Sequence, residues 1–219
     1  MNGKRITIFS GHYGSGKTNV ALTYALSERD KGKKVAIADI DIVNPYFRTK
    51  DSEALLAERG IRLICSEYAN TNIDIPALPQ DIYAIVDDKS LTCILDVGGD
   101  ERGALALGRI APAIRAENDY DMIFVANRYR PLTATVEGAM EVLREIEAAA
   151  GLRFTAIVNN SNLGAETEVE DVLSSEAFGK ALSEAAGLPL IATSVSESMH
   201  EALSGRMAGL YPIRLQKHL

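Results

Sequence analysis

Cysteine, histidine and tryptophan are scarce in this sequence. Among its 219 residues are two cysteines, three histidines and no tryptophan. Cys65 and Cys93 both lie inside apolar runs, and no Cys-x-x-Cys or Cys-x-Cys pair occurs. This pattern argues against a disulfide framework, a zinc ribbon and an iron–sulfur site. We therefore expect two buried, inert thiols in a protein of a reducing compartment.

Long hydrophobic runs and an excess of basic charge are also missing. No run approaches the roughly 18 apolar residues that a membrane span needs, and the first residues do not resemble a signal peptide. The formal net charge is −7, which argues against sequence-independent binding to nucleic acid or to an anionic membrane. These absences predict a cytoplasmic protein with no membrane partner, and they disfavour a nucleic acid partner.

What the chain does contain is a set of seven short apolar runs, mostly rich in β-branched residues or leucine. The runs show little alternation with polar residues, which is typical of strands covered on both faces of a parallel sheet. The length suits one domain with one core over residues 1–219. The runs occupy residues 5–10, 34–39, 61–65, 93–97, 122–127, 154–160 and 188–193.

Helical patterns separate most of these runs. The spacing of apolar residues predicts helices over 17–31 and 133–149, the first of which stops at Gly32. Asp51 as a cap and Gly60 as a stop predict a third helix over 51–59. Alternating strands and helices indicate an α/β domain with right-handed crossovers. Residues 66–81 contain two prolines and are expected to form a long loop. Such a loop is either functional or a plain surface excursion.

One eight-residue segment carries the most specific motif. Residues 11–18, GHYGSGKT, follow the first apolar run and match G-x-x-x-x-G-K-[ST]. Glycines there let backbone N–H groups face a phosphate, and the following helix adds its positive end. Lys17 is expected to reach the β- and γ-phosphates and Thr18 to bind Mg²⁺. The predicted nucleotide-binding residues of this phosphate loop are Gly11, Tyr13, Gly14, Ser15, Gly16, Lys17, Thr18 and Asn19.

Acidic residues end two of the predicted strands. Asp96 begins a D-x-x-G segment, as in a Walker B strand that leads to a γ-phosphate-sensing loop. Asp39 and Asp41 leave another strand end on the same side. Because ligands bind at the carboxyl ends of parallel strands, we expect Asp39 and Asp96 to hold the metal, and Asp41 or Asp100 to act on the attacking water. Strand-end aspartates also serve as ordinary helix caps and turn residues.

The order of these motifs resembles the MinD/ParA-type ATPases. These share a fold with the nitrogenase iron protein and with the nucleotide domains of CobQ/CobB-type amide ligases, and the similarity covers nearly the whole chain. The resemblance implies a three-layer P-loop NTPase fold with a mostly parallel sheet of seven or eight strands flanked by helices. It also implies ATP or ADP with Mg²⁺ as cofactors, and a switch that often forms an ATP-dependent homodimer.

Several segments carry this resemblance. KKVAIADIDIVN is similar to the MinD strand whose second aspartate is hydrolytic, which implies that role for Asp41. DVGGD is similar to the switch segment of the iron protein, at Asp96 and Asp100. IVNNSN resembles the strand whose asparagine contacts the adenine edge, which maps best to Asn159. FVANRYRP matches the family strand that ends in an asparagine near the active face. TSVSESMHEA lies where these proteins have a loop beside the nucleotide base.

The sequence also departs from that family. His12 stands where relatives carry a lysine that reaches the partner's phosphates across the dimer, so this contact is weakened, absent or made by an arginine. Gly103 replaces the cluster cysteine of the iron protein, which excludes electron transfer through a cluster. Neither a membrane-targeting helix nor an added DNA-binding region is found. The candidate arginines, whose planar fork suits phosphate, are Arg48, Arg102, Arg128 and Arg130.

Two classes of function follow. The absence of the GTPase base motif N-K-x-D favours ATP over GTP. The first interpretation is a Mg²⁺-dependent ATPase that acts as a nucleotide-driven switch on an unknown protein partner, with residues 41–50 and 98–108 responding to the γ-phosphate. The alternative is a ligase or kinase, similar to CobB or dethiobiotin synthetase, that acts on a small acceptor beside residues 66–81. A third interpretation is a nucleotide-binding module without catalysis.

Overall fold

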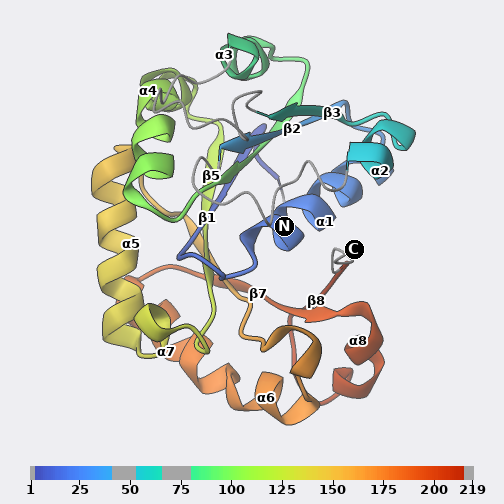
Figure 1. Cartoon of the computed structure of the whole chain (residues 1–219), viewed down its shortest axis with the longest axis vertical. Coiled ribbons are helices and arrows are strands. Elements are labelled where there is room, and N and C mark those ends of the chain that lie inside the picture. The colour runs from blue at the N-terminus through green and yellow to red at the C-terminus, as the bar shows by residue number, and fades with distance from the viewer. Residues whose placement is uncertain (1–2, 41–52, 66–79, 215–219) are drawn as a thin grey trace, which may run out of the picture.

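A single eight-stranded sheet organises the chain. The computed structural model describes residues 3–40, 53–65 and 80–214 (Figure 1). Within these ranges every pairing of neighbouring strands is parallel, in the order β3-β2-β4-β1-β5-β6-β7-β8. The strands are β1 (Ile6–Ser10), β2 (Val35–Ile40), β3 (Arg62–Cys65), β4 (Thr92–Val97), β5 (Tyr120–Ala126), β6 (Ala156–Asn159), β7 (Leu190–Ser196) and β8 (Leu210–Ile213).

Helices alternate with the strands. Two short 3-10 helices, η3 (Pro131–Thr133) and η4 (Gly164–Glu166), follow the ends of β5 and β6. The α-helices are α1 (Lys17–Asp30), α2 (Glu53–Glu58), α3 (Gln80–Asp87), α4 (Glu101–Glu117), α5 (Val136–Ala150), α6 (Val169–Ser174), α7 (Glu176–Ala186) and α8 (Glu197–Leu203).

The helices cover both faces of the sheet and make three layers (Figure 1). Along β1, Ile6 and Ile8 join an apolar cluster completed by α4, α5 and α7, whereas Phe9 joins a second cluster under α1. Successive strand residues face opposite sides, so a strand that is apolar throughout requires cover on both. The predicted three-layer α/β fold is therefore confirmed.

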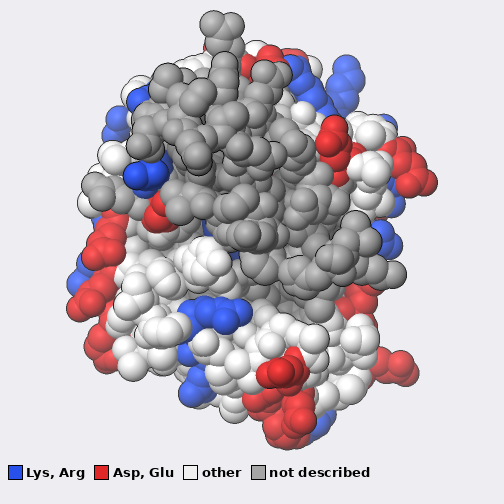
Figure 2. Space-filling model, viewed as in Figure 1, with Lys and Arg blue, Asp and Glu red and all other residues white. Residues whose placement is uncertain are grey.

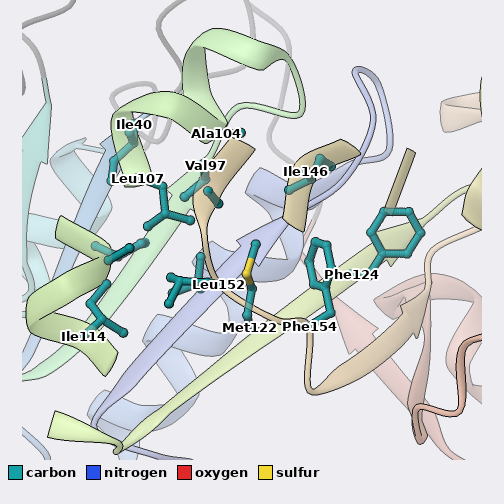
Figure 3. Close-up of a cluster of buried hydrophobic side chains, with 14 of the residues drawn as sticks. Ile40, Val97, Ala104, Leu107, Ile114, Met122, Phe124, Ile146, Leu152 and Phe154 are labelled. Carbon is teal, nitrogen blue, oxygen red and sulfur yellow. The ribbon is translucent and has the colours of Figure 1, made fainter. Parts of the chain in front are cut away.

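The larger cluster lies between the sheet and helices α4 and α5 (Figure 3). Met122 and Phe124 of β5 contribute to it from the sheet, with Leu107 of α4 and Ile146 of α5. The rings of Phe124 and Phe154 meet edge to face, with centroids 5.2 Å apart. Full burial of each such side chain contributes about 1.5–3 kcal/mol. This packing fixes β5, whose carboxyl end forms part of the site described below.

All seven predicted strands are present, and the eighth is an addition. The residue pattern does not predict β8, because Leu210–Ile213 has only four residues and includes a proline. Proline lacks the N–H that a central strand needs, but it is tolerated at an edge. Among the strands that the structure describes, β8 pairs with β7 alone and forms the sheet edge.

The helices differ from the predictions in number as well as in their boundaries, because α3, α4, α6, α7 and α8 are not among the predicted helices. The predicted helix over 133–149 begins at Val136, because Thr135 caps it by accepting a bond from the Gly138 N–H at 3.2 Å, and η3 precedes it. The α4 helix is not predicted, since two glycines and Pro112 interrupt its pattern. Helix α3 includes the last two residues of the predicted 66–81 loop, and the rest of that loop lies outside the described residues.

The cysteine and membrane predictions are tested only in part. Cys93 is fully buried in β4, and burial raises the pKa of its thiol to about 12, which makes it inert as expected. The side chain of Cys65 lies outside the described set. In the ranges that the structure describes, no helix has both the length and the apolar character to cross a bilayer.

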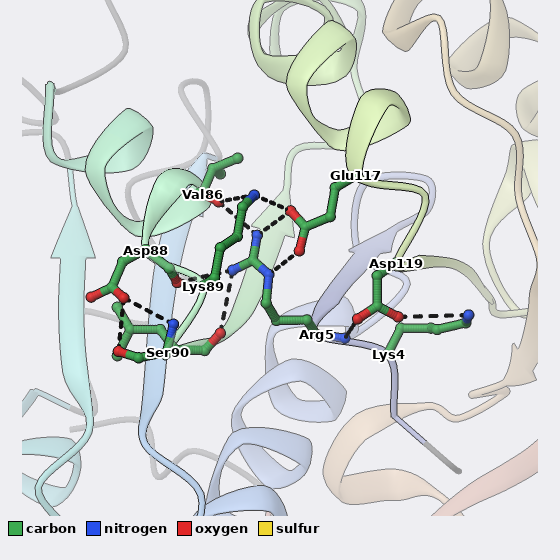
Figure 4. A network of polar contacts seen from close by, with 9 residues as sticks. Lys4, Arg5, Val86, Asp88, Lys89, Ser90, Glu117 and Asp119 are labelled. Atoms are coloured by element: carbon green, nitrogen blue, oxygen red, sulfur yellow. Dashed lines mark hydrogen bonds and ion pairs between the residues drawn. The ribbon is translucent and has the colours of Figure 1, made fainter.

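A charged cluster ties the amino ends of the strands to α3 and α4 (Figure 4). The Arg5 guanidinium, just before β1, donates to both carboxylate oxygens of Glu117, and the Lys89 ammonium donates to the same group. Arg5 also donates to the carbonyl of Val86 at 2.6 Å. The bond from Arg5, aided by Lys89, lowers the pKa of Glu117 to about 2. We call Arg5, Lys89 and Glu117 the amino-end cluster.

Candidate functional site

The phosphate loop, residues 11–16, joins the end of β1 to the start of α1. Gly14 and Gly16 have φ of 73° and 81°, a left-handed conformation that side chains beyond glycine rarely adopt. The Ser15 N–H donates to the His12 carbonyl at 3.0 Å and closes the turn. Gly16 is the N-cap of α1 and has no side chain that could bond to the N–H groups of the first turn. The loop therefore delivers the positive end of α1 to the carboxyl edge of the sheet.

Neighbouring strands press closely on this loop. A Cβ on Gly11 would lie 2.2 Å from the carbonyl oxygen of Val125 in β5. A Cβ on Gly16 would lie 2.2 Å from the amide nitrogen of Asn160, just after β6. Glycine is required at both places because the ends of three strands meet there.

Two buried carboxylates lie at the same edge. Asp39 of β2 and Asp96 of β4 are ladder partners on adjacent strands, and Phe9 of β1 pairs with Asp96 from the other side. Ile37 and Ile94, two residues earlier, join the α1 cluster, so strand alternation directs both aspartates to the face that α1 covers. Both are at most 5% exposed.

Lys17 and Thr18 occupy the first turn of α1, on the same side as these aspartates, and both are buried. The described residues hold no group of three or more His, Cys, Asp or Glu that would enclose a metal by themselves. Mg²⁺ commonly takes one or two carboxylates and completes its shell with water and substrate phosphates. Asp39, Asp96 and the Thr18 hydroxyl fit such a partial set of ligands.

The D-x-x-G segment lies directly against the phosphate loop. A Cβ on Gly99 would be 1.7 Å from the carbonyl oxygen of Gly11 and 2.9 Å from the Cα of His12. Asp100 caps α4, because its carboxylate accepts a hydrogen bond from the Gly103 N–H at 2.9 Å. The cap is one of the two roles that the sequence leaves open for Asp100, and its catalytic role stays a prediction.

Other predicted residues are placed unevenly. Asp41 and Arg48 lie outside the described residues, as does the segment 41–50. The Tyr13 side chain is 55% exposed on the phosphate loop, whereas Ser15 is buried within it. Asn19 is half-buried in the first turn of α1.

Asn159 does not offer its amide to a ligand. It is fully buried, its Nδ2 donates to the Ser175 hydroxyl at 2.9 Å, and its Oδ1 accepts from the Ser161 hydroxyl at 2.6 Å. These bonds tie the end of β6 to the junction of α6 and α7. In this structure Asn159 therefore braces the strand end, and its contact with an adenine stays a prediction without support from the geometry.

The next residue, Asn160, is the one that reaches the phosphate loop. Its Nδ2 donates to the Ser15 carbonyl at 2.6 Å, and its Oδ1 accepts from the Ser194 hydroxyl at 2.6 Å. Asn160 is not among the residues predicted from the sequence; the signal for it is that adjacent strand residues face opposite sides, so the two asparagines of IVNNSN point in different directions. A cavity beside Asn160, between the ends of β6 and β7, is lined by Asn162, Thr167, Ser194, Ser196 and Met199.

The arginines of the turn after β5 point in different directions. The Nε of Arg130 donates to the Gly14 carbonyl at 2.8 Å. The Nη1 of Arg128 donates instead to the Ser174 carbonyl at 2.8 Å, and its guanidinium lies 5.6 Å from the ring centroid of Tyr129. Arg102 is exposed on α4. Of the described candidates, Arg130 is the one seen in contact with the phosphate loop.

Charge around the loop also acts on His12. Burial lowers the pKa of His12, and the positive charges of Lys17 and Arg130 lower it further. The imidazole is therefore neutral at pH 7. In the view of Figure 2, one basic patch lies below the grey region among uncharged atoms, while other basic and acidic side chains lie toward the rim.

Comparison with known proteins supports the fold. No protein-family model matches the chain, and a search of curated proteins gives no significant match. Among solved structures, the chain is similar to FtsY from Mycoplasma mycoides, with a TM-score of 0.61 and 19% identity over 90% of this chain and 62% of that one. The signal recognition particle receptor FtsY from Elizabethkingia anophelis gives 0.58 and 16%, over 92% and 62%.

A third similar structure is the cell division protein FtsY from Thermotoga maritima, with a TM-score of 0.60 and 17% identity over 90% of this chain and 64% of that one. The chain thus spans less than two thirds of the length of these structures. At such identities the likeness shows a shared fold, that of the P-loop NTPases. It agrees with the fold that the sequence resemblance implies, while the narrower MinD/ParA assignment stays a prediction.

Proposed function

We propose that this protein is a Mg²⁺-dependent ATPase that works as a nucleotide-driven switch on a protein partner. The observation that carries the proposal is the contact between Gly99 and Gly11, which joins the D-x-x-G segment to the phosphate loop. A γ-phosphate in the loop would press on this contact. Nucleotide binding and hydrolysis can then move the start of α4, and the partner protein would bind one position of α4 more tightly than the other.

The proposed chemistry needs few groups. Lys17 and the first-turn N–H groups of α1 would bind the β- and γ-phosphates, and Thr18, Asp39 and Asp96 would hold Mg²⁺. When bound, Mg²⁺ would supply positive charge to the phosphate oxygens. Asp41 remains our candidate for orienting the attacking water. Asp100 is the second candidate, and it would have to release its cap on Gly103 to take that role.

We favour ATP as the nucleotide because the N-K-x-D motif is absent downstream of the phosphate loop. One of the similar structures is a complex of FtsY with GDP, so guanine is the competing base. The cavity between β6 and β7 lies beside Asn160, which itself bonds to the phosphate loop. We assign the base to this cavity. Asn162 and Ser196, which line it, are the candidates for hydrogen bonds to the edge of the base.

A protein partner, or a second copy of this chain, is supported by apolar side chains around the loop. Tyr13 on the phosphate loop, Leu132 after Arg130 and Leu163 after β6 are 55%, 58% and 41% exposed. Exposed apolar groups around a ligand site favour contact with another protein. The ligase or kinase alternative depended on residues 66–81, of which 66–79 lie outside the described part of the chain.

Calorimetric titration with ATP, GTP and ADP in Mg²⁺ tests this proposal. We expect binding, with ATP preferred. Lys17→Ala should weaken ATP binding by about 100-fold or more, because it removes a buried positive charge that binds phosphate. Lys180→Ala, a change at an exposed lysine of α7, is the matched control and should bind like the wild type. A folded wild type that binds no nucleotide, or a Lys17→Ala variant that binds as tightly, would refute the proposal.

Light scattering on an Asp41→Ala variant, in ATP and then in ADP, separates the switch from the ligase or kinase. A larger mass in ATP alone supports a dimerising switch. The same mass in both nucleotides, together with turnover that requires a small acceptor, supports the alternative.

A further inference from the structure

We propose that Arg130 is the second cation of the phosphate site, acting within its own chain to position the terminal phosphate. This inference rests on the proposed function, since it assumes a nucleoside triphosphate in the loop. It answers the question raised by His12, which stands where relatives carry a lysine. Arg130, in the turn after β5, would supply the positive charge that a lysine at position 12 would have supplied.

The contact between Arg130 and the loop is direct. The Arg130 Nε donates to the Gly14 carbonyl at 2.8 Å. A Cβ on Gly14 would lie 3.1 Å from that nitrogen, and the φ of 73° also favours glycine, so this position leaves room for the guanidinium. The bond uses one of five guanidinium N–H groups. No hydrogen bond links the two terminal nitrogens to the part of the chain that the structure describes, so they can meet a phosphate oxygen.

Buried polar bonds hold the backbone of Arg130 in place. Asn127 is fully buried; its Oδ1 accepts from the Tyr129 N–H at 2.9 Å, and its Nδ2 donates to the Asn162 carbonyl at 3.0 Å. The Arg130 N–H donates to the Asn127 carbonyl at 3.2 Å, and the Arg130 carbonyl accepts from the Thr133 N–H at 3.0 Å.

Proline follows Arg130 directly and restricts its backbone further. A side chain on so constrained a turn loses little backbone entropy when it binds. The turn therefore has a constrained backbone that holds the side chain of Arg130 against the phosphate loop.

Electrostatics assign the charge to Arg130 rather than to His12. In the nucleotide-free chain, burial and the two neighbouring cations lower the pKa of the His12 imidazole, which disfavours its charged form. A triphosphate carries several negative charges, more than the single charge of Lys17 offsets. A guanidinium matches phosphate geometry with two parallel donors, which makes it a suitable second cation.

Arg128 provides a matched control inside the same turn. It has the same side chain two residues earlier, but it is held against the Ser174 carbonyl and the Tyr129 ring, away from the loop. Removing its charge changes the net charge of the protein by the same amount. The two arginines therefore differ in their contact with Gly14.

The test measures binding of ATP–Mg²⁺, ADP–Mg²⁺ and adenosine to the wild type and to the Arg130→Gln, Arg130→Lys and Arg128→Gln variants. Arg130→Gln should weaken ATP binding at least about tenfold, as loss of one charge-assisted bond implies. ADP should lose less, and adenosine should bind unchanged. Arg130→Lys, which keeps the charge, should recover most of the ATP affinity, and Arg128→Gln should match the wild type.

Two results would overturn the inference while the proposed function stands. One is wild-type ATP affinity in Arg130→Gln when Lys17→Ala has lost it. The other is an equal loss for ATP, ADP and adenosine, which would mean that the loop collapses without Arg130. A folded wild type that binds no nucleotide would overturn both proposals together.

A mixing experiment tests whether the charge acts within one chain. Lys17→Ala and Arg130→Gln subunits are combined, and ATP turnover is compared with that of each variant alone. If Arg130 serves its own chain, no mixed dimer holds both cations at one site and turnover stays low. Recovery of turnover in the mixture would show that Arg130 serves a partner's site, which contradicts the inference.

Discussion

The two edges of the sheet carry similar charged residues in opposite arrangements. At the amino edge, Arg5 and Lys89 bring their positive charges to one carboxylate, Glu117. At the carboxyl edge, two buried aspartates lie side by side on adjacent strands, next to a glycine-rich loop. The first arrangement pairs opposite charges within the chain and stabilises the fold. The second places two acidic side chains beside backbone N–H groups of a phosphate loop, as a site for a metal ion and phosphate does.

The largest contrast is expected from neutralising one carboxylate at the carboxyl edge. Asp96→Asn should lower Mg²⁺-dependent ATP turnover by about 100-fold or more, because the metal loses a charged ligand. Steady-state turnover measures this change, and circular dichroism checks that the variant is folded. Turnover near that of the wild type would contradict the metal assignment.

A smaller effect is expected when the two loops of the carboxyl edge are forced apart. Gly99→Ala places a Cβ where the carbonyl oxygen of Gly11 lies, at 1.7 Å, so the D-x-x-G segment must shift. We expect ATP turnover to fall about tenfold, as small misplacements in an active site commonly cause. Gly108→Ala, in the middle of α4, is the control and should keep turnover. Unchanged turnover in Gly99→Ala would mean that this contact does not couple the loops.

The amino-end cluster should show the reverse behaviour, with a cost in stability alone. Glu117→Gln should lower the free energy of unfolding at pH 7 by about 2 kcal/mol, because it removes a charged partner from the half-buried Arg5. Nucleotide affinity should not change. A variant that loses nucleotide binding without losing stability would break the comparison between the two edges.

The same cluster predicts a pH dependence with a definite sign. The pKa of Glu117 is lowered from 4.5 to about 2 in the folded protein. The ionised carboxylate therefore stabilises the fold fully above pH 4.5, and this contribution is lost as the pH falls toward 2. Urea denaturation from pH 2 to 6 should show a steeper loss for the wild type than for Glu117→Gln. Parallel curves would contradict the pairing.

The smallest predicted effect concerns His12. Because Arg130 is one of the causes of the lowered pKa of this imidazole, after burial and Lys17, Arg130→Gln should raise that pKa. NMR titration of the imidazole follows the change. Arg128→Gln should leave the value as it is in the wild type, and an equal shift in both variants would mean that only net charge matters.

Local physical patterns made much of the fold predictable. Apolar runs without alternation identified seven strands. The spacing of glycines, with Lys17 and Thr18, identified the phosphate-binding motif of residues 11–18. The β8 strand was out of reach because a four-residue edge strand with a proline has no such run. Helix α4 was missed because Gly103, which brings its start against Gly98, also weakens its helical pattern, as do Gly108 and Pro112.

The candidate site was less predictable because its contacts are set by tertiary packing. Asn159 and Asn160 are adjacent and identical in chemistry, yet one braces the α6–α7 junction and the other bonds to the phosphate loop. Arg128 and Arg130 divide in the same way. Sequence spacing locates such residues at a strand end, but the direction of each side chain depends on the turn that holds it.

Amide hydrogen exchange of the wild-type chain, with and without ATP–Mg²⁺, tests the central claim most directly because it follows both edges at once. The account predicts slower exchange in residues 11–18 and 98–103 when nucleotide is bound. It predicts no change in the segments around Arg5, Lys89 and Glu117. Unchanged exchange in residues 11–18 at saturating nucleotide, or protection at the amino edge instead, would contradict the account.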